Sequence, residues 1–350
     1  MKIQKSISLK PYNTFAVDAQ ADFFVELHHE QDISELILTD IFSTQQHLIL
    51  GGWANILFTK DYNGLVIKVS LLGKQVVKED DTKVYVKVWA GENRHETMMR
   101  SLKQWFVGGE NLVLIPGQIW SAPVGNIGAY GKEAKDIIFE VEGIDLLTQE
   151  KKVWKNNECG FTYRDSIFKH ALKNKILITA VTFVFEQESS DYKPNIQYSD
   201  IQEIIVKQWR DPAHISPQGL ADIIITIREN KLPDWKKIGT AWSFFKNPIV
   251  SKDEYEKLLL TYPQLKWNEV HNSAFWIPHS AFKLSAGQLI ELAGYKGRHE
   301  WPIATYDKHA LIIVNTGGAS GNEIRAFAQS IQKKVLELFG VTLEPEVIIL

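Results

Sequence analysis

The segment 176–185 constrains the fold most, because its side chains are apolar almost without interruption. A strand of this kind is covered on both faces, so we expect it near the centre of a sheet. Segment 84–89 alternates apolar and polar residues with period two, which predicts a strand with one buried face. Residues 47–50, 65–69 and 139–147 are also strand-like. We therefore expect sheet to form a substantial part of the core.

Helix signals are interspersed among these strands. Segment 216–228 opens with serine at the cap and proline at the first helical position, and 251–254 is a capping box. Segment 320–339 ends at Gly340, a glycine typical of a helix C-terminus, and 96–106 is a further predicted helix. Helices and strands mixed in this way, without a repeat, indicate an α/β or α+β protein.

Length and composition indicate an ordinary globular protein. The chain has 350 residues, of which 45% are apolar and 23% charged, so we expect two or three domains. The formal net charge of -3 argues against a nucleic-acid footprint, which needs a basic stripe. No apolar run reaches the roughly 20 residues that span a bilayer, and the histidines show no metal-ligand spacing. We therefore expect no nucleic-acid, membrane or metal partner.

The amino-terminal segment and the cysteine content bear on the compartment. The start of the chain lacks the apolar core of a signal peptide. Cys159 is the only cysteine, which excludes an internal disulfide and suits a reducing environment. We therefore expect a cytoplasmic protein with a structural thiol.

Two glycine-containing loops are candidates for binding a phosphorylated ligand. Segment 114–131 is dense in Gly, Pro, Ser and Asn, and Gly51-Gly52 follows the strand-like segment 47–50. Backbone N–H groups in such loops cradle a pyrophosphate where no side chain intervenes. Taken alone, segment 114–131 is equally well interpreted as a structured surface loop. Neither a dinucleotide-binding glycine fingerprint nor a Walker phosphate loop is present.

Three further segments, 161–169, 241–248 and 343–347, each set a polar residue among apolar neighbours, as in a built site. Each polar residue alone has an ordinary interpretation, such as a surface ion pair or a helix cap. Together and in this order, the segments resemble the UDP-N-acetylenolpyruvoylglucosamine reductase (MurB) family. The resemblance extends over roughly residues 9–347.

The resemblance implies an α+β fold, with FAD-binding domains of the vanillyl-alcohol-oxidase type and a substrate-binding α+β domain. The implied domains are residues 1–70, residues 71–227 with 341–350, and residues 228–340. The implied reaction reduces UDP-N-acetylenolpyruvoylglucosamine to UDP-N-acetylmuramate in peptidoglycan synthesis, with FAD as cofactor and NADPH as hydride donor. It also implies a monomer whose partner is the small-molecule UDP-sugar.

The resemblance assigns three catalytic residues. Ser243 matches the family's proton donor, and a serine hydroxyl serves as an acid only where neighbours stabilise the developing enolate. Arg164 and Glu346 match residues that polarise the enolpyruvyl carboxylate, for which a planar guanidinium is well suited. Glu346 is expected to act in its protonated form, or through the arginine or a water.

The resemblance also assigns binding residues. For the UDP-sugar they are Tyr198, as a clamp, and Lys231 and Asn247, which would hold the diphosphate. The implied cofactor-binding positions are Gly51, Gly52, Asn55, Ser121, Asn126, Ile127, Gly128, Ala129, Tyr130, Gly131, Tyr163 and Arg228.

The sequence departs from the family pattern at several glycines. Trp53, Trp120 and Trp242 stand where the family has glycine, and Ala54 stands where it has serine. Glycine in such loops supplies a positive φ or lets a ligand reach the backbone, so we expect strain or lost ligand volume at these positions. Two alternatives to the reductase therefore stay open: a folded relative with impaired flavin binding and no catalysis, and another flavin oxidoreductase of the same superfamily.

Overall fold

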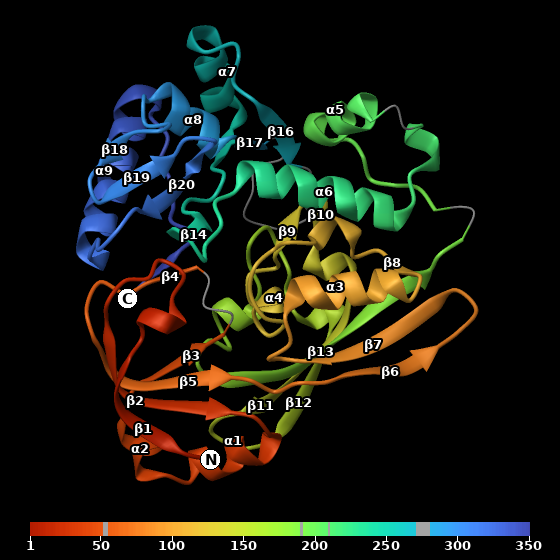
Figure 1. Cartoon of the computed structure of the whole chain (residues 1–350), viewed down its shortest axis with the longest axis vertical. Helices are drawn as coiled ribbons and strands as arrows, with labels where there is room; N and C mark the ends of the chain where they lie inside the picture. The colour runs from red at the N-terminus through yellow and green to blue at the C-terminus, as the bar shows by residue number, and fades with distance from the viewer. Residues whose placement is uncertain (52–54, 190–191, 209–210, 271–280) are drawn as a thin grey trace. The chain divides into compact units, whose positions relative to one another are not determined.

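The computed structural model describes residues 1–51, 55–189, 192–208, 211–270 and 281–350. Figure 1 shows the whole chain with its helices and strands labelled. Both of its compact units mix helices and sheets, which confirms the predicted α+β class. The first unit comprises residues 1–7, 21–52 and 63–230, and the second comprises residues 8–20, 53–62 and 231–350.

The first unit contains a four-stranded sheet at its amino-terminal end. The strands lie in the order β1 (Ile3–Ser8), β2 (Gln20–Leu27), β5 (Tyr62–Val69) and β3 (His47–Leu50). Strands β3 and β5 are parallel, with His47 opposite Leu65. Helix α1 (Glu30–Ile37) buries Ile33 and Leu36 in the same cluster as Val25 of β2 and Ile67 of β5, and α2 (Asp40–Thr44) adds Phe42.

A larger antiparallel sheet forms the rest of the first unit. Its order is β12 (Lys151–Lys155), β11 (Ile138–Asp145), β13 (Ile176–Gln187), β7 (Lys83–Trp89) and β6 (Lys74–Glu79), with β8 (Phe106–Val107) also paired to β13. The first eight residues of β13 are all buried, which confirms its predicted central place. Helices α3 (Arg94–Lys103) and α6 (Pro217–Lys231) bury apolar residues in the cluster that covers this sheet, and α5 (Ser199–Lys207) adds two isoleucines.

Helix α3 begins two residues before the predicted start at Glu96 and ends before the predicted end at Phe106. The early start arises because the Asn93 side chain caps the helix by accepting a hydrogen bond from the Glu96 backbone N–H at 3.1 Å. The early end coincides with Trp105, whose φ of 62° lies outside the helical region.

The second unit is built around two antiparallel sheets. One has the order β14 (Gly239–Ser243), β20 (His309–Asn315), β19 (Ile303–Tyr306), β18 (His299–Glu300), and the other β15 (Ile249–Ser251), β17 (Ala281–Leu284), β16 (Trp267–Val270). A short parallel pair joins β21 (Ile348–Ile349) to β4 (Ile56–Leu57). The helices are α7 (Lys252–Thr261), α8 (Ala286–Leu292) and α9 (Gly321–Phe339).

Local sequence accounts for two of these helices. The capping box predicted at Ser251 is present, with Ser251 and Glu254 bonded in both directions. Helix α9 ends at Gly340, whose φ of 68° is the left-handed conformation that stops a helix. Both predictions are confirmed.

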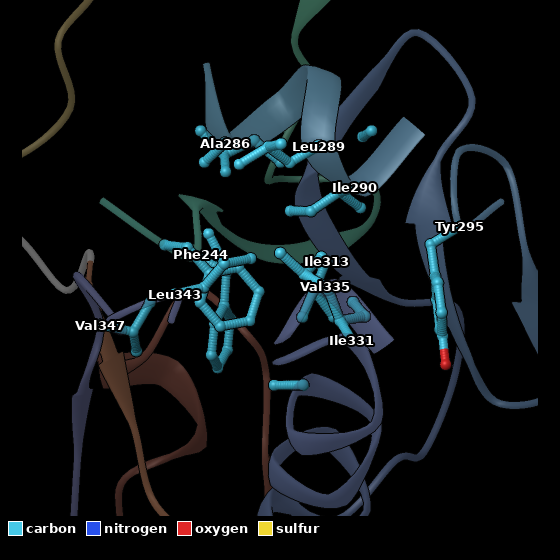
Figure 2. Packing of buried hydrophobic residues seen from close by; sticks show 14 of the residues in the cluster. Phe244, Ala286, Leu289, Ile290, Tyr295, Ile313, Ile331, Val335, Leu343 and Val347 are labelled. Atoms are coloured by element: carbon cyan, nitrogen blue, oxygen red, sulfur yellow. The ribbon is translucent and has the colours of Figure 1, made fainter. Parts of the chain in front are cut away.

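The core of the second unit gathers residues from its helices, from β20 and from the carboxyl-terminal segment (Figure 2). Phe244 is fully buried and lies with Leu343 and Val347, while Ile331 and Val335 of α9 belong to the same cluster. Burial of a side chain of this size stabilises a fold by about 1.5–3 kcal/mol. The core thus anchors residue 244, which directly follows the candidate proton donor.

The predicted division into three domains stays a prediction. Contacts group residues 341–350 with residues 231–340, because β21 pairs with β4 inside the second unit.

Candidate functional site

A bulge in β14 positions Ser243. Thr240 lies opposite Val314 and Ser243 opposite Ile312, so β14 holds one residue more than β20 over this stretch. Trp242, in the extra stretch, has φ 61°, and its backbone N–H donates to the Thr240 hydroxyl at 3.0 Å. A bulge of this kind re-aims the side chain that follows it. The predicted positive φ is therefore confirmed at Trp242, where a residue other than glycine is strained by about 1–2 kcal/mol.

Backbone pairing brings Glu346 beside this strand end. The Glu346 N–H donates to the Phe244 carbonyl at 2.8 Å, and the Lys246 N–H donates to the Glu344 carbonyl at 2.9 Å. The Asn55 amide donates to the Glu346 carbonyl at 2.9 Å. The structure thus brings together Ser243, Glu346 and Asn55, from three distant parts of the chain.

Arg164 lies in a tight turn of the first unit. Thr162 and Asp165 exchange backbone hydrogen bonds at 3.1 and 3.2 Å, and Arg164 has φ 56°. Its guanidinium donates to the Gly128 carbonyl at 2.6 Å and lies 5.3 Å from the Tyr163 ring centroid. Arg164 therefore contacts the glycine-rich loop predicted to bind the cofactor, and Tyr163 lies beside its guanidinium.

That loop continues into a two-residue hairpin. Strand β9 (Gly128–Ala129) pairs with β10 (Lys132–Glu133), and the turn residues Tyr130 and Gly131 have φ 49° and 78°. Two successive positive φ values are the signature of a type I′ turn, which matches the twist of the strands. A Cβ at Gly128 would lie 2.5 Å from the Lys132 carbonyl oxygen, so this hairpin requires glycine.

Hydrogen bonds of Asn126 and Ile127 stabilise the conformation of the loop. The Asn126 amide nitrogen donates to Glu133 Oε2 at 3.0 Å and to the Thr162 carbonyl at 2.8 Å, while its oxygen accepts from the Lys135 N–H. The Ile127 N–H donates to the Ala122 carbonyl at 3.2 Å. The Asn126 side chain is therefore engaged by the protein, and any contact it makes with a cofactor would come from the backbone.

Arg94 is a residue of this site that the sequence prediction missed. It is 3% exposed and donates to the carbonyls of Pro116 and Gln118, both at 3.0 Å, and to Ser121 Oγ at 2.7 Å. Burial lowers the pKa of Arg94 to about 9, so the guanidinium stays charged at neutral pH. Ser121 is the first residue of α4 (Ser121–Val124). The available signal was Asn93: a cap there places Arg94 in the first helical turn.

Tyr130, Tyr198 and Arg228 flank the same loop. The Tyr198 ring meets the Tyr130 ring edge-on, with centroids 5.5 Å apart, and burial raises the pKa of Tyr130 to about 12. Arg228 donates to the Leu114 carbonyl at 3.1 Å, and burial lowers its pKa. Asn195 donates to the Tyr130 carbonyl at 3.3 Å, so the segment that carries Tyr198 is attached to the loop.

Buried polar atoms without a protein partner gather at this loop. Buried polar atoms are almost always hydrogen-bonded, so a group of exceptions leaves room for ordered waters or for a polar ligand. A flavin dinucleotide, with its ring nitrogens, carbonyls and phosphates, fits such a set of donors and acceptors. Within the described residues, the atoms at or beside the loop are Arg94 Nε, Asn111 Oδ1, Trp120 Nε1, Asn195 Oδ1 and Arg228 Nε.

Trp120 covers Gly51, the residue that follows strand β3. A Cβ built on Gly51 would lie 1.6 Å from Trp120 Nε1 and 2.5 Å from Cδ1, so the indole lies directly on this glycine. Trp120 has φ −55°, so of the two expected effects, backbone strain and lost ligand volume, strain is absent here and the effect of the tryptophan is its volume. Gly52, Trp53 and Ala54 lie outside the described residues.

Three residues singled out from the sequence remain: Asn247, Lys231 and Cys159. Asn247 Oδ1 accepts from the Ala286 N–H at 2.9 Å, at the start of α8. Lys231 is the last residue of α6 and is exposed. Cys159 is buried, and burial raises the pKa of its thiol to about 12, consistent with a structural residue.

Comparison with known proteins identifies two matching domain families. Residues 21–153 match the FAD binding domain, and residues 234–350 match the C-terminal domain of UDP-N-acetylenolpyruvoylglucosamine reductase. Among the described residues, no helix has the length and apolar character needed to cross a membrane.

Full-length relatives and a solved structure agree with this result. The chain is 39% identical to the UDP-N-acetylenolpyruvoylglucosamine reductase of Flavobacterium johnsoniae and 40% identical to that of Bdellovibrio bacteriovorus, over 99% of both chains in each case. The crystal structure of UDP-N-acetylenolpyruvylglucosamine reductase (MurB) from Thermus caldophilus is similar with a TM-score of 0.66, covering 100% of this chain and 99% of that chain. At 19% identity, that likeness concerns the fold.

Proposed function

Because the chain belongs to the UDP-N-acetylenolpyruvoylglucosamine reductase family, we propose that it reduces UDP-N-acetylenolpyruvoylglucosamine to UDP-N-acetylmuramate in peptidoglycan synthesis. The full-length relatives support this reaction, with FAD as cofactor and NADPH as reductant. The observation within the molecule that supports it most is the backbone pairing of residues 244–246 with 344–346, which places Glu346 opposite Phe244, the residue that follows Ser243.

The cofactor-binding role is supported by the unpartnered polar atoms at the glycine-rich loop. Arg94 donates to two carbonyls of the loop and Arg228 to one, and among the described residues neither Nε has a partner, which leaves both for a ligand. Ser121, Gly131 and the backbone of residues 126–130 complete the proposed cradle, together with Tyr163. Gly51 and Asn55 would contribute from the other glycine loop. When bound, FAD would supply the hydride, obtained from NADPH, for reduction of the enolpyruvyl double bond.

Ser243 is proposed to supply the proton. Reduction of a carbon–carbon double bond needs one hydride and one proton, which add to its two carbons. A serine hydroxyl is a weak acid, so it acts only where the negative charge that develops on the substrate is stabilised. The bulge at Trp242 and the pairing of Phe244 with Glu346 fix the backbone on both sides of this hydroxyl.

Arg164 and Glu346 are proposed to stabilise that charge. A guanidinium binds a carboxylate through two parallel hydrogen bonds and stays charged at every physiological pH. The Arg164 backbone conformation is fixed by its turn, and its side chain is aimed by the Gly128 carbonyl. Glu346 is proposed to act in its protonated form, or through the arginine or a water, since a bare carboxylate would repel the substrate carboxylate.

Three residues are proposed to bind the UDP-sugar. Tyr198 is 43% exposed and contacts Tyr130 at a ring-centroid distance of 5.5 Å, and an aromatic side chain that is partly exposed is suited to clamp a nucleotide. Lys231 carries a positive charge suited to the diphosphate, and the Asn247 amide nitrogen would reach the same group. We also propose a cytoplasmic location and a monomer, which sedimentation of the purified protein would test.

The test is NADPH oxidation by the FAD-loaded protein, followed by absorbance. We expect oxidation with UDP-N-acetylenolpyruvoylglucosamine and none with UDP-N-acetylglucosamine, which lacks the double bond. Ser243→Ala should lower kcat by about 10²–10⁴-fold, the usual contribution of a positioned acid, while NADPH still reduces the flavin. Ser43→Ala, an exposed serine of α2, is the matched control and should leave kcat unchanged. A Ser243→Ala enzyme with normal kcat would refute the assigned proton donor.

A further inference from the structure

We propose that the Trp120 indole occupies the space beside Gly51 where FAD would bind. FAD must then displace the indole, so that cofactor binding is coupled to rotation of this side chain. The inference rests on the proposed function in one respect, namely that the ligand is FAD. It concerns a residue that stands where the family has glycine, and it makes Trp120 the determinant of flavin affinity in this chain.

The position of Gly51 marks it as a place where a phosphate would lie. Gly51 follows β3, which pairs in parallel with β5. Ligands of sheets with parallel strands bind beyond the carboxyl ends of the strands, and a residue without a side chain there lets a phosphate reach the backbone. The Trp120 indole now fills the space that this missing side chain leaves, at 1.6 Å from where a Cβ would be.

The indole N–H lacks a hydrogen-bond acceptor among the described residues in this position. Its nitrogen, Nε1, is buried, and a buried indole normally donates a hydrogen bond. Among the residues that the structure describes, the indole is therefore held in this position only by packing against apolar side chains. An occupant of this kind can be displaced by a ligand that offers acceptors.

The backbone beneath the indole is fixed, so only the side chain has to move. The Trp120 N–H donates to the Ala90 carbonyl at 3.0 Å, and the Ile119 N–H donates to the Glu92 carbonyl at 3.0 Å. The next residue, Ser121, is held by Arg94. Rotation of the indole would expose the Gly51 backbone without disturbing the cradle formed by Arg94.

The contact between indole and glycine can be tested without cofactor. We would measure urea unfolding of the wild type, Gly51→Ala, Trp120→Gly and the double variant. A Cβ at position 51 cannot coexist with the indole, so Gly51→Ala should lower the unfolding midpoint clearly in the wild type and little in the Trp120→Gly background. Equal effects of Gly51→Ala in both backgrounds would overturn the structural premise.

Displacement is tested by FAD titration, read from the quenching of flavin fluorescence. We expect Trp120→Gly and Trp120→Ala to bind FAD at least tenfold more tightly than the wild type, and Trp120→Phe, which keeps the bulk, to stay within threefold of it. Trp105→Gly is the matched control. This tryptophan of the same unit is 70% exposed and has φ 62°, so glycine is well accepted and the FAD affinity should not change.

The outcomes separate this inference from the proposed function. Equal FAD affinity of Trp120→Gly and the wild type would overturn the inference even if the wild type turns over substrate. An affinity of Trp120→Phe equal to that of Trp120→Gly would also overturn it, because ring volume would then not be the cause. Tighter binding by Trp120→Gly, with no substrate-dependent NADPH oxidation in any variant, would uphold the inference and refute the proposed reaction.

Discussion

Replacement of Trp242 tests how the bulge that places Ser243 is built. A residue other than glycine at φ 61° is strained by about 1–2 kcal/mol, and Trp242→Ala keeps this strain while Trp242→Gly removes it. Both variants lose the indole, so its packing cancels in the comparison. Glycine also gains conformational freedom in the unfolded chain, which costs about 0.4–1 kcal/mol.

The free energy of unfolding of Trp242→Gly should therefore exceed that of Trp242→Ala by roughly 0.5–1 kcal/mol, the difference between these two effects. At an ordinary urea dependence of about 1–3 kcal/mol per molar, the unfolding midpoint of Trp242→Gly should exceed that of Trp242→Ala by a few tenths molar. Circular dichroism during urea titration measures this difference.

Trp267 provides the matched comparison. It lies in β16 of the same unit, has no positive φ and packs against Tyr255 and Phe282. In a regular strand, a glycine makes the fold less stable than an alanine does by about 0.5–1 kcal/mol. The unfolding midpoint of Trp267→Ala should therefore exceed that of Trp267→Gly. The order of the two variants is thus reversed between positions 242 and 267. An unfolding midpoint of Trp242→Ala equal to or higher than that of Trp242→Gly would refute the strained backbone proposed for the bulge.

Two further predictions concern titratable groups. Burial keeps the Cys159 thiol protonated, so it should react with a thiol reagent at neutral pH only after unfolding; rapid labelling of the folded protein would contradict its buried position. Asp145 accepts hydrogen bonds from Lys152 at 2.7 Å and from the backbone N–H groups of Thr148 and Leu147, which hold its pKa at about 2. A carboxyl whose pKa is lower in the folded than in the unfolded chain stabilises the fold at any pH above its unfolded pKa, and this stabilisation is lost as the pH falls to the folded pKa. Asp145→Asn should therefore be less stable than the wild type at neutral pH, and the difference in stability should narrow between about pH 4 and pH 2. A stability difference independent of pH in thermal unfolding would contradict this.

Features that depend on neighbouring residues could be predicted from the sequence. The capping box at Ser251 and the glycine at 340 act within one helical turn, so α7 and α9 follow from their own residues. The unbroken apolar run of β13 likewise requires cover on both faces, which only a central strand has.

Features that depend on distant segments could not be predicted in the same way. The bulge at Trp242 exists only against β20, and the left-handed conformation at this position was inferred from the family rather than from local sequence. The burial of Arg94 depends on the return of the loop that contains Pro116 and Ser121. The contact between Trp120 and Gly51 depends on two loops about seventy residues apart, so the sequence alone could not decide between the two expected effects of this tryptophan, backbone strain and lost ligand volume.

The most direct test of the account is reoxidation of the reduced flavin by substrate. The FAD-loaded protein would be reduced with NADPH in the absence of oxygen and then mixed with UDP-N-acetylenolpyruvoylglucosamine or with UDP-N-acetylglucosamine. We expect the absorbance of oxidised flavin to return with the enolpyruvyl nucleotide and not with the other sugar nucleotide. Flavin that stays reduced with both nucleotides would contradict it.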